Sequence, residues 1–250
     1  MFRASLSAIL IVVALALGLP TCAMGIEFSG VQWSVTSGNN LTPGPSNWSP
    51  SNVYKDSSGN LVLQITKVNG VCYGAQAYSQ TLYRFGRFEW WVVGYPEQFP
   101  PDVIFGLFTF TGPSRFNEID IEYSRWGNAF LDPGNFAVYP SDSYSLARCP
   151  SGWSLSANRA CGQSFKGLNS SSTTQRFTWS SSNVLFEVLS GHRSDSGSPV
   201  KVSRYTPTSG SAIPQKSAPV YMNLYVPNSA CGKITVSPIK IIIRRFSYSP

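Results

Sequence analysis

A five-residue run in the middle of the chain, Glu118-Ile119-Asp120-Ile121-Glu122, alternates acidic residues with β-branched apolar ones. Side chains of a β-strand point alternately to the two faces of a sheet. A strand here therefore places the three carboxyls on one face and the two isoleucines on the other. The isoleucine face can pack in a hydrophobic core. The three carboxyls repel one another, which costs stability without a structural gain. The run therefore predicts a strand whose acidic face serves chemistry.

Short strand-like segments separated by turns recur along the rest of the chain. Glycine and proline are frequent, with 21 and 18 residues, and aromatic residues reach 14%. We expect strands over residues 61–66, 84–93, 103–111, 118–122, 176–179, 184–189, 219–226 and 239–248. This spacing predicts an all-β fold, a β-sandwich or jelly roll. Residues 141–173 interrupt the rhythm, and we expect them to form a long loop beside a cleft or an ornament at its rim.

Residues 1–23 have the pattern of a secretory signal peptide. Arg3 is followed by an apolar run over residues 4–19, which ends at Pro20 and is shorter than the roughly 20 residues of a membrane span. The alternative is an uncleaved anchor. We expect a secreted, extracellular protein with no membrane attachment after signal removal. No repeat or linker divides the remainder, so we expect residues 26–250 to form a single domain.

Four cysteines remain if Cys22 leaves with the signal peptide: Cys72, Cys149, Cys161 and Cys231. An even number in an exported chain indicates two disulfides, and three pairings are possible. We favour Cys149 with Cys161, because this pairing closes a short Ser-rich loop and would contribute roughly 3 kcal/mol.

The formal net charge is +7, and the basic residues are scattered along the chain. A nucleic-acid-binding protein would gather them on one face, so we expect no nucleic-acid partner. The single histidine, His192, cannot form a metal site alone, and the cysteine spacing fits no zinc motif. We expect no metal, no cofactor and a monomer.

The acidic run has the composition that glycoside hydrolysis requires: one ionised and one protonated carboxyl, close together on a rigid support. The Cα atoms of Glu118 and Glu122 would be about 13 Å apart in an extended strand, whereas the carboxyls of a retaining pair are about 5–5.5 Å apart. The two side chains must therefore lean inward over Asp120, which predicts a concave strand. One Glu would attack the anomeric carbon, and the other would protonate the leaving oxygen and then activate water.

The acidic run resembles the active-site strand of glycoside hydrolase family 16 (GH16), and three other segments resemble strands of the same family. These are Phe108-Thr109-Phe110-Thr111-Gly112-Pro113, Phe85-Gly86-Arg87-Phe88-Glu89 and Tyr221-Met222-Asn223-Leu224-Tyr225. The resemblance covers about residues 28–248. One residue separates Asp120 from Glu122, as in lichenases, plant xyloglucan-modifying enzymes and fungal wall transglycosylases. Laminarinases, agarases and carrageenases of the family usually have two.

The resemblance implies a concanavalin A-like β-sandwich jelly roll, in which two curved antiparallel sheets form a concave substrate cleft. It also implies retaining cleavage of β-glycans. It places the nucleophile at Glu118, an assisting acid at Asp120 and the acid/base at Glu122. The one-residue spacing favours a β-1,4 or mixed β-1,3/1,4 glucan as the polysaccharide substrate. Ile243 stands where the family has a calcium-binding Asp, so we expect no calcium there. The candidate substrate-binding residues are Gln76, Tyr78, Phe110, Trp126, Asn223 and Tyr225.

Several of these candidates depart from the lichenase pattern. Gln76 and Tyr78 stand where lichenases have a Glu and an Arg that hold sugar hydroxyls. Phe110 replaces a cleft Tyr, and Tyr225 replaces a stacking Trp. We expect Trp126 to supply another aromatic platform just after the acid/base.

Three functions remain open on this site. The first is a secreted endo-β-glucanase that works by double displacement. The second is a transglycosylase that uses the same acids to remodel wall polysaccharide. The third is a catalytically silent, lectin-like glycan binder, which usually lacks one of the acids, whereas all three are present here.

Overall fold

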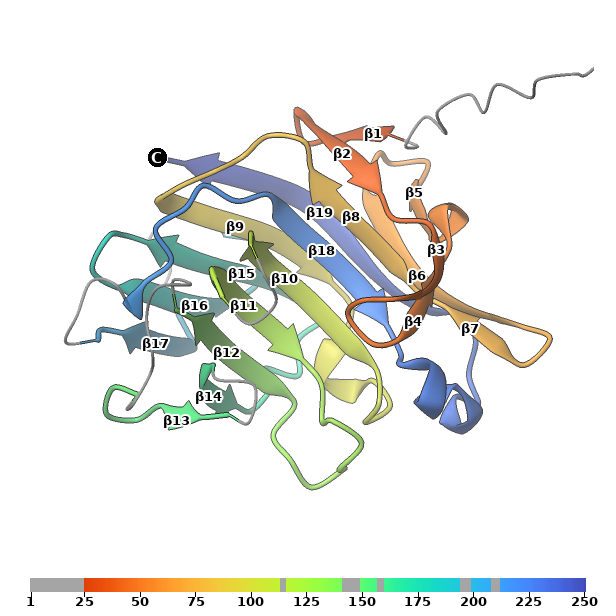
Figure 1. The fold of residues 1–250 in the computed structure, drawn as a ribbon. Helices are drawn as coiled ribbons and strands as arrows, with labels where there is room; N and C mark the ends of the chain where they lie inside the picture. The colour runs from red at the N-terminus through yellow and green to blue at the C-terminus, as the bar shows by residue number, and fades with distance from the viewer. Residues whose placement is uncertain (1–24, 113–115, 141–148, 157–159, 194–198, 208–211) are drawn as a thin grey trace, which may run out of the picture.

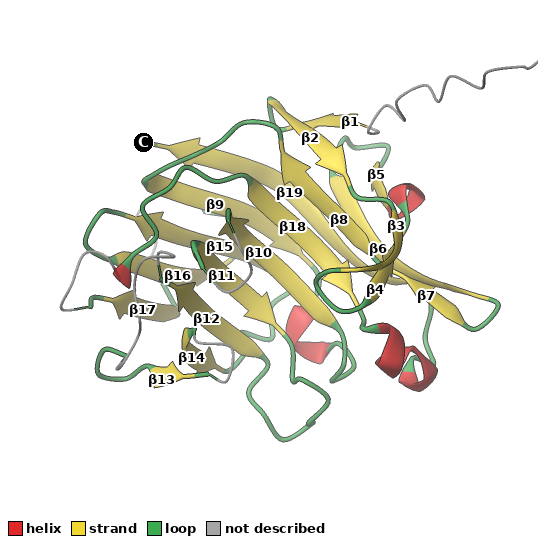
Figure 2. Ribbon diagram, in the orientation of Figure 1, coloured by secondary structure: helices red, strands yellow, loops and turns green. Residues whose placement is uncertain are grey.

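The computed structural model describes residues 25–112, 116–140, 149–156, 160–193, 199–207 and 212–250. The signal peptide expected at residues 1–23 lies outside these ranges. Within them, the structure contains no helix with the length and hydropathy to cross a membrane. Strands dominate the described part of the chain, and helical structure is confined to short turns (Figure 2).

Two antiparallel sheets lie one behind the other (Figure 1). Across the first sheet the described strands are β1 (Gly25–Phe28), β2 (Val31–Val35), β8 (Ala75–Ser79), β18 (Val220–Tyr225), β10 (Ile104–Phe110), β11 (Glu118–Tyr123), β12 (Gly134–Tyr139), β14 (Cys161–Phe165) and β13 (Ser154–Leu155). The strands of the second are β17 (Lys201–Tyr205), β16 (Val184–Ser190), β15 (Ser172–Trp179), β9 (Gly86–Val93), β19 (Ile239–Ser249), β6 (Leu61–Val68) and β5 (Val53–Lys55). The predicted jelly-roll sandwich is therefore confirmed.

The remaining elements are short. Strand β7 (Val71–Tyr73) pairs with β6, and β3 (Gly38–Leu41) pairs with β4 (Ser46–Trp48) in a separate hairpin. Three 3₁₀ turns, η1 (Pro50–Asn52), η2 (Pro96–Gln98) and η4 (Asn228–Lys233), connect strands in the described residues.

The hydrophobic core fills the space between the two sheets, as expected when each sheet has one apolar face. Ile119 and Ile121 of β11 are fully buried in this core. The second sheet contributes Trp90 and Phe177, whose ring centroids are 5.6 Å apart. Because the isoleucines are anchored in this way, the alternate residues of β11 must project from the opposite face of the first sheet.

The predicted strands match observed strands, but the loop expected over residues 141–173 is only partly correct. Residues 161–165 form β14, which pairs with β12 and extends the first sheet. Apolar burial rather than alternation holds this strand: Phe165 packs on Phe136 with ring centroids 4.3 Å apart. Residues 141–148 and 157–159 lie outside the described residues.

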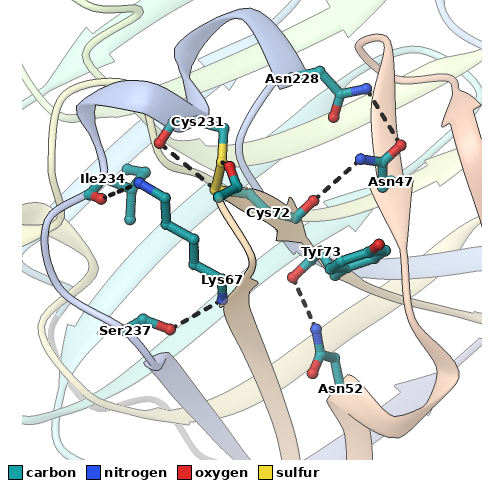
Figure 3. The surroundings of a disulfide bond; sticks show 10 residues. Asn47, Asn52, Lys67, Cys72, Tyr73, Asn228, Cys231, Ile234 and Ser237 are labelled. Carbon is teal, nitrogen blue, oxygen red and sulfur yellow. Dashed lines mark hydrogen bonds between the residues drawn. A yellow bond between two sulfur atoms is a disulfide. The ribbon is translucent and has the colours of Figure 1, made fainter.

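Both disulfides are present, and the favoured pairing of Cys149 with Cys161 is confirmed. The second bond joins Cys72 of β7 to Cys231 of η4, which are 159 residues apart in the sequence. Figure 3 shows this bond and the hydrogen bonds around it. Two disulfides fit the oxidising compartment that an exported chain passes through.

Asn47 connects the β3–β4 hairpin to this disulfide (Figure 3). Its Nδ2 donates to the carbonyl oxygen of Cys72 at 3.3 Å, and its Oδ1 accepts a hydrogen bond from Nδ2 of Asn228 at 3.3 Å. The Asn228 backbone N–H also donates to the carbonyl oxygen of Pro45 at 2.9 Å. The hairpin is therefore held against η4 and β7 by hydrogen bonds.

Candidate active site

The three acids of β11 project from the face of the first sheet that is turned away from the core. Asp120 is 2% exposed, and Glu118 and Glu122 on either side of it are half-buried. Each acid has an in-register neighbour on both adjacent strands, β10 and β12. The acids therefore lie in the interior of the sheet, where a rigid backbone holds them.

Two cavities lined by described residues meet at Glu118 and Glu122. The first has a volume of about 380 Å³ and lies over β8, β18, β10 and β11. It is lined by Thr42, Pro43, Gln76, Gly106, Phe108, Phe110, Glu118, Asp120, Glu122, Tyr221, Asn223 and Tyr225. The second has a volume of about 600 Å³ and lies over β11, β12 and β14. It is lined by Pro43, Glu118, Glu122, Trp126, Asn135, Ala137, Tyr139, Ser156, Ala160, Gly162 and Tyr225. Together they form a cleft that crosses the strands and passes over the acids.

Burial raises the pKa of all three carboxyls. It raises the pKa of Glu118 to about 8, an effect that the charge of Glu122 reinforces and a hydrogen bond with Asp120 opposes. Burial also raises the pKa of Glu122 to about 7, against a hydrogen bond from Asn135. The pKa of Asp120 lies well above its usual range, first because of burial and then because of the two flanking glutamates. The cluster therefore retains at least one proton near neutral pH, as general acid catalysis requires.

The charge of Glu122 adds to the rise in the pKa of Glu118, so the two carboxyls affect each other electrostatically. The assignment of Glu118 as nucleophile and of Glu122 as acid/base is the one that the family resemblance implies.

Two tyrosines border the acids. The hydroxyls of Tyr139 and Tyr225 have pKa values above the ordinary range, first because of burial and then because of the charges of the acids. Both phenols therefore stay protonated and remain available as hydrogen-bond donors. The ring of Tyr225 packs on Trp48 of the β3–β4 hairpin, with ring centroids 5.2 Å apart. This contact brings the hairpin against the cleft.

Five of the six candidate substrate-binding residues line the cleft. Gln76, Phe110 and Asn223 line the first cavity, Trp126 lines the second, and Tyr225 lines both. The sixth, Tyr78, does not line either cavity. Its ring stacks on Tyr221 with centroids 5.4 Å apart. Tyr221 stacks in turn on Phe108 at 4.9 Å.

Other cleft residues were not among the candidates. Tyr221 and Phe108 could have been found in segments that were recognised as strands. Tyr221 shares a strand face with Asn223 and Tyr225, and Phe108 shares one with Phe110. Asn135 and Tyr139 lie on β12, which the sequence pattern did not reveal as a strand. Their role follows only from the pairing of β12 with β11.

Ile243 lies in β19 and is fully buried in the hydrophobic core. The described residues also contain no group of three His, Cys, Asp or Glu side chains arranged to hold a metal ion.

No family model matches the sequence, and no curated protein does. Comparison with solved structures instead identifies the class of fold, which is that of the GH16 β-glucanases. The Bacillus licheniformis β-glucanase shares 20% identity over 87% of this chain and 92% of that chain, with a TM-score of 0.60. A Bacteroides ovatus mixed-linkage-glucan GH16 protein, solved with a G4G4G3G product, shares 14% over 87% and 94%, with a TM-score of 0.60. The laminarinase from Flavobacterium sp. UMI-01 shares 13% over 87% and 93%, with a TM-score of 0.63. At these identities the likeness establishes the fold that the resemblance implied.

Proposed function

We propose that the protein is a secreted, retaining endo-β-glucanase that cleaves a β-1,4 or mixed β-1,3/1,4 glucan. One observation carries the proposal: Glu118, Asp120 and Glu122 share one strand face at the junction of two cavities. A polysaccharide that lies across both cavities would present an internal glycosidic bond to two carboxyls at once. Endo cleavage requires that arrangement.

The reaction follows from the two glutamates. The Glu118 carboxylate attacks the anomeric carbon while Glu122 donates its proton to the glycosidic oxygen, so the leaving chain departs as an alcohol. A covalent glycosyl ester on Glu118 results. Glu122, now ionised, takes a proton from water, and the water oxygen displaces Glu118 from the sugar. Asp120, within hydrogen-bond reach of Glu118, helps to hold the shared proton.

Three features support a neutral β-glucan as the substrate. The solved structures of this fold include proteins named for β-glucan, for mixed-linkage glucan and for laminarin, so the fold itself is compatible with several linkages. The single residue between Asp120 and Glu122 favours the β-1,4 or mixed-linkage class. The described lining residues include no Lys, Arg or His, so the acids are the only charged groups among them, which suits a neutral glucan.

Product analysis tests this proposal. Wild-type mature protein and its Glu118→Gln variant would be offered barley mixed-linkage glucan, laminarin, xyloglucan and a sulfated galactan, each with and without a labelled oligosaccharide acceptor. We expect new reducing ends from mixed-linkage glucan with wild type only. Label that enters polymer without new reducing ends would instead establish a transglycosylase. Equal binding of a glycan by both proteins with no reaction would establish a lectin.

Azide separates the roles of the two glutamates. With an activated aryl β-glucoside substrate, azide can replace a missing nucleophile and gives the α-glycosyl azide. If the acid/base is missing, azide attacks the glycosyl-enzyme and gives the β-glycosyl azide. We expect the α product from Glu118→Ala and the β product from Glu122→Ala. The reverse result would exchange the two assignments.

A further inference from the structure

The loop between β11 and β12, residues 124–133, projects from one end of the first sheet (Figure 1). It presents two large apolar side chains to solvent: Phe130 is 98% exposed, and Leu131 is 45% exposed. Neither side chain lines the two cavities over the acids. An aromatic ring that the described part of the chain leaves uncovered, next to a second apolar side chain, is typical of a surface that binds a partner.

Hydrogen bonds hold the backbone that carries these two side chains. At the base of the loop, the N–H of Arg125 donates to the carbonyl oxygen of Pro101 at 3.2 Å. At the tip, Oδ1 of Asn128 accepts from the N–H of Phe130 at 3.0 Å, and the Asn128 carbonyl oxygen accepts from the N–H of Leu131 at 3.1 Å. A partner that binds here would therefore immobilise little additional backbone, which lowers the entropic cost of binding.

The same loop contributes to the cleft. Trp126 lines the second cavity and is 53% exposed, and its backbone N–H donates to Oγ of Ser124 at 3.0 Å. Trp126 and the exposed pair, Phe130 and Leu131, thus belong to one short, hydrogen-bonded loop. A ligand chain that leaves the second cavity past Trp126 would continue onto this loop.

The charges of the loop favour an uncharged partner. Its one basic residue is Arg125, whose guanidinium donates to the carbonyl oxygens of Glu97 and Phe99 at 2.7 and 3.3 Å. The remaining charged residue of the loop is Asp132, which is exposed. An anionic lipid surface attracts Lys and Arg side chains that face it, so this loop is poorly suited to a membrane.

The size of the loop argues against a second copy of the chain as the partner. A stable protein interface takes about 800 Å² and 20–30 residues from each partner, whereas residues 124–133 form the whole loop. A polysaccharide chain needs less area, because one aromatic ring can cover the apolar face of one sugar unit.

We propose that Phe130 and Leu131 form a docking surface for the part of the glucan chain that extends beyond the second cavity, with the ring of Phe130 stacked on a sugar ring. This surface contacts sugar units remote from the cleaved bond. It therefore favours long chains over short ones, since binding energy from such units is gained only by a substrate that reaches them. The inference rests on the proposed function and adds chain length to its specificity.

Substrates of different length test the docking surface. We expect Phe130→Ala to lower kcat/KM on polymeric barley mixed-linkage glucan about three- to tenfold, the size of one aromatic contact. The activated aryl β-glucoside is too short to reach the loop, so its kcat/KM should stay at the wild-type value. Because the side chain is exposed, the Tm should also stay the same. An equal loss on both substrates, or no loss on the polymer, would overturn the proposal.

Two matched variants separate stacking from general apolar contact. Phe130→Tyr keeps an aromatic face and should retain wild-type kcat/KM on the polymer. Phe130→Leu keeps an apolar side chain without a ring and should lose nearly as much as Phe130→Ala. Full activity of Phe130→Leu would contradict stacking on a sugar ring.

A binding measurement separates this inference from the proposed reaction. Glu118→Gln, alone and combined with Phe130→Ala, would be run in native gels that contain mixed-linkage glucan. Weaker retardation of the double variant supports the inference even if wild type cleaves no glucan. Equal retardation of the two proteins, or none of either, contradicts it whatever the activity.

The same two proteins test the other partners. Binding to vesicles of anionic phospholipid that is lost with Phe130→Ala would assign the loop to a lipid surface. A dimer in sedimentation velocity that is lost with Phe130→Ala would assign it to a second copy of the chain. Either result would overturn the proposal, and we expect neither.

Discussion

Burial of Glu118, Asp120 and Glu122 raises the pKa values of the three carboxyls, and it lowers the stability of the folded protein when they ionise. The pKa of Glu118 is raised first by burial and then by the charge of Glu122. A carboxyl whose pKa is higher in the folded protein than in the unfolded chain binds its proton more tightly when folded. Its stabilising contribution is complete below the unfolded pKa of about 4.5 and is lost as the pH rises toward 8.

Replacement of Glu118 by Gln should therefore stabilise the protein at high pH. We expect the Tm of Glu118→Gln to approach that of wild type near pH 4.5 and to exceed it at pH 8. The gain would be about 1–3 kcal/mol, at about 2–4 °C per kcal/mol for a domain of this size. Thermal unfolding of both proteins at a series of pH values measures the difference. A Tm difference for Glu118→Gln that does not change with pH would contradict the burial of a proton in the cleft.

At the scale of elements, the loop between β11 and β12 places an aromatic ring at the edge of the second cavity. Arg125 donates from Nη2 to the carbonyl oxygen of Glu97 at 2.7 Å and from Nη1 to that of Phe99 at 3.3 Å, which fixes the start of the loop. Trp126 follows with a φ of 50° and is 53% exposed. A bulky residue held in this backbone region and exposed beside a cleft is typical of a functional position.

Trp126 is therefore expected to contact the glycan beyond Glu122. Trp126→Ala should lower kcat/KM on polymeric glucan about tenfold, since stacking on an aromatic ring contributes on the order of 1 kcal/mol or more. Because the ring is mostly exposed, the Tm should change little. Trp126→Phe keeps an aromatic face and should recover most of the activity. If Trp126→Ala were as active as wild type, the glycan would have to leave the cleft by another route.

Some strands of the first sheet could be predicted from their sequence pattern, whereas others could not. Strand β11 and its neighbour β10 have strong apolar patterns that reveal them directly. Strand β14 has the sequence Cys-Gly-Gln-Ser-Phe, with apolar residues only at its ends, so its pattern is that of a loop. It forms a strand because it pairs with β12, where the ring of Phe165 stacks on that of Phe136.

At the scale of the whole molecule, the two disulfides differ in what they hold. The bond between Cys149 and Cys161 spans 12 residues, whereas the bond between Cys72 and Cys231 spans 159. Because the Cys72–Cys231 bond closes the longer loop, it removes more entropy from the unfolded chain. Its stabilising effect is therefore about 2 kcal/mol larger than that of the Cys149–Cys161 bond. Through Asn47, the longer-range bond also supports the hairpin whose Pro43 lines both cavities.

Removal of the two bonds should therefore have different consequences. We expect the Cys72→Ala, Cys231→Ala double variant to lose more thermal stability than Cys149→Ala with Cys161→Ala. It should also lose activity at a temperature where it remains folded, because the hairpin side of the cleft loosens. Tm and kcat/KM of both double variants measure these effects. Equal kcat/KM for the two variants would contradict a link between this disulfide and the cleft.

Several properties of the molecule could be predicted from the sequence because they depend on residues close together in the chain. Alternation in residues 118–122 determined that the acids share a face, since the geometry of a strand allows no other arrangement. The short Cys149–Cys161 bond likewise closes a local loop. The β-rich pattern and its turns were sufficient to predict a β-sandwich or jelly roll.

Only the tertiary structure decided what surrounds the acids. Strands β18 and β11 flank β10 in register, which brings Asn223 and Glu122 to either side of Gly106. Gln76 donates to Oγ1 of Thr36 at 2.9 Å and accepts a hydrogen bond from Nδ2 of Asn223 at 3.5 Å, and both partners lie far from it in the sequence. No local pattern encodes such contacts, because strand order and register are set by the packing of the whole sandwich.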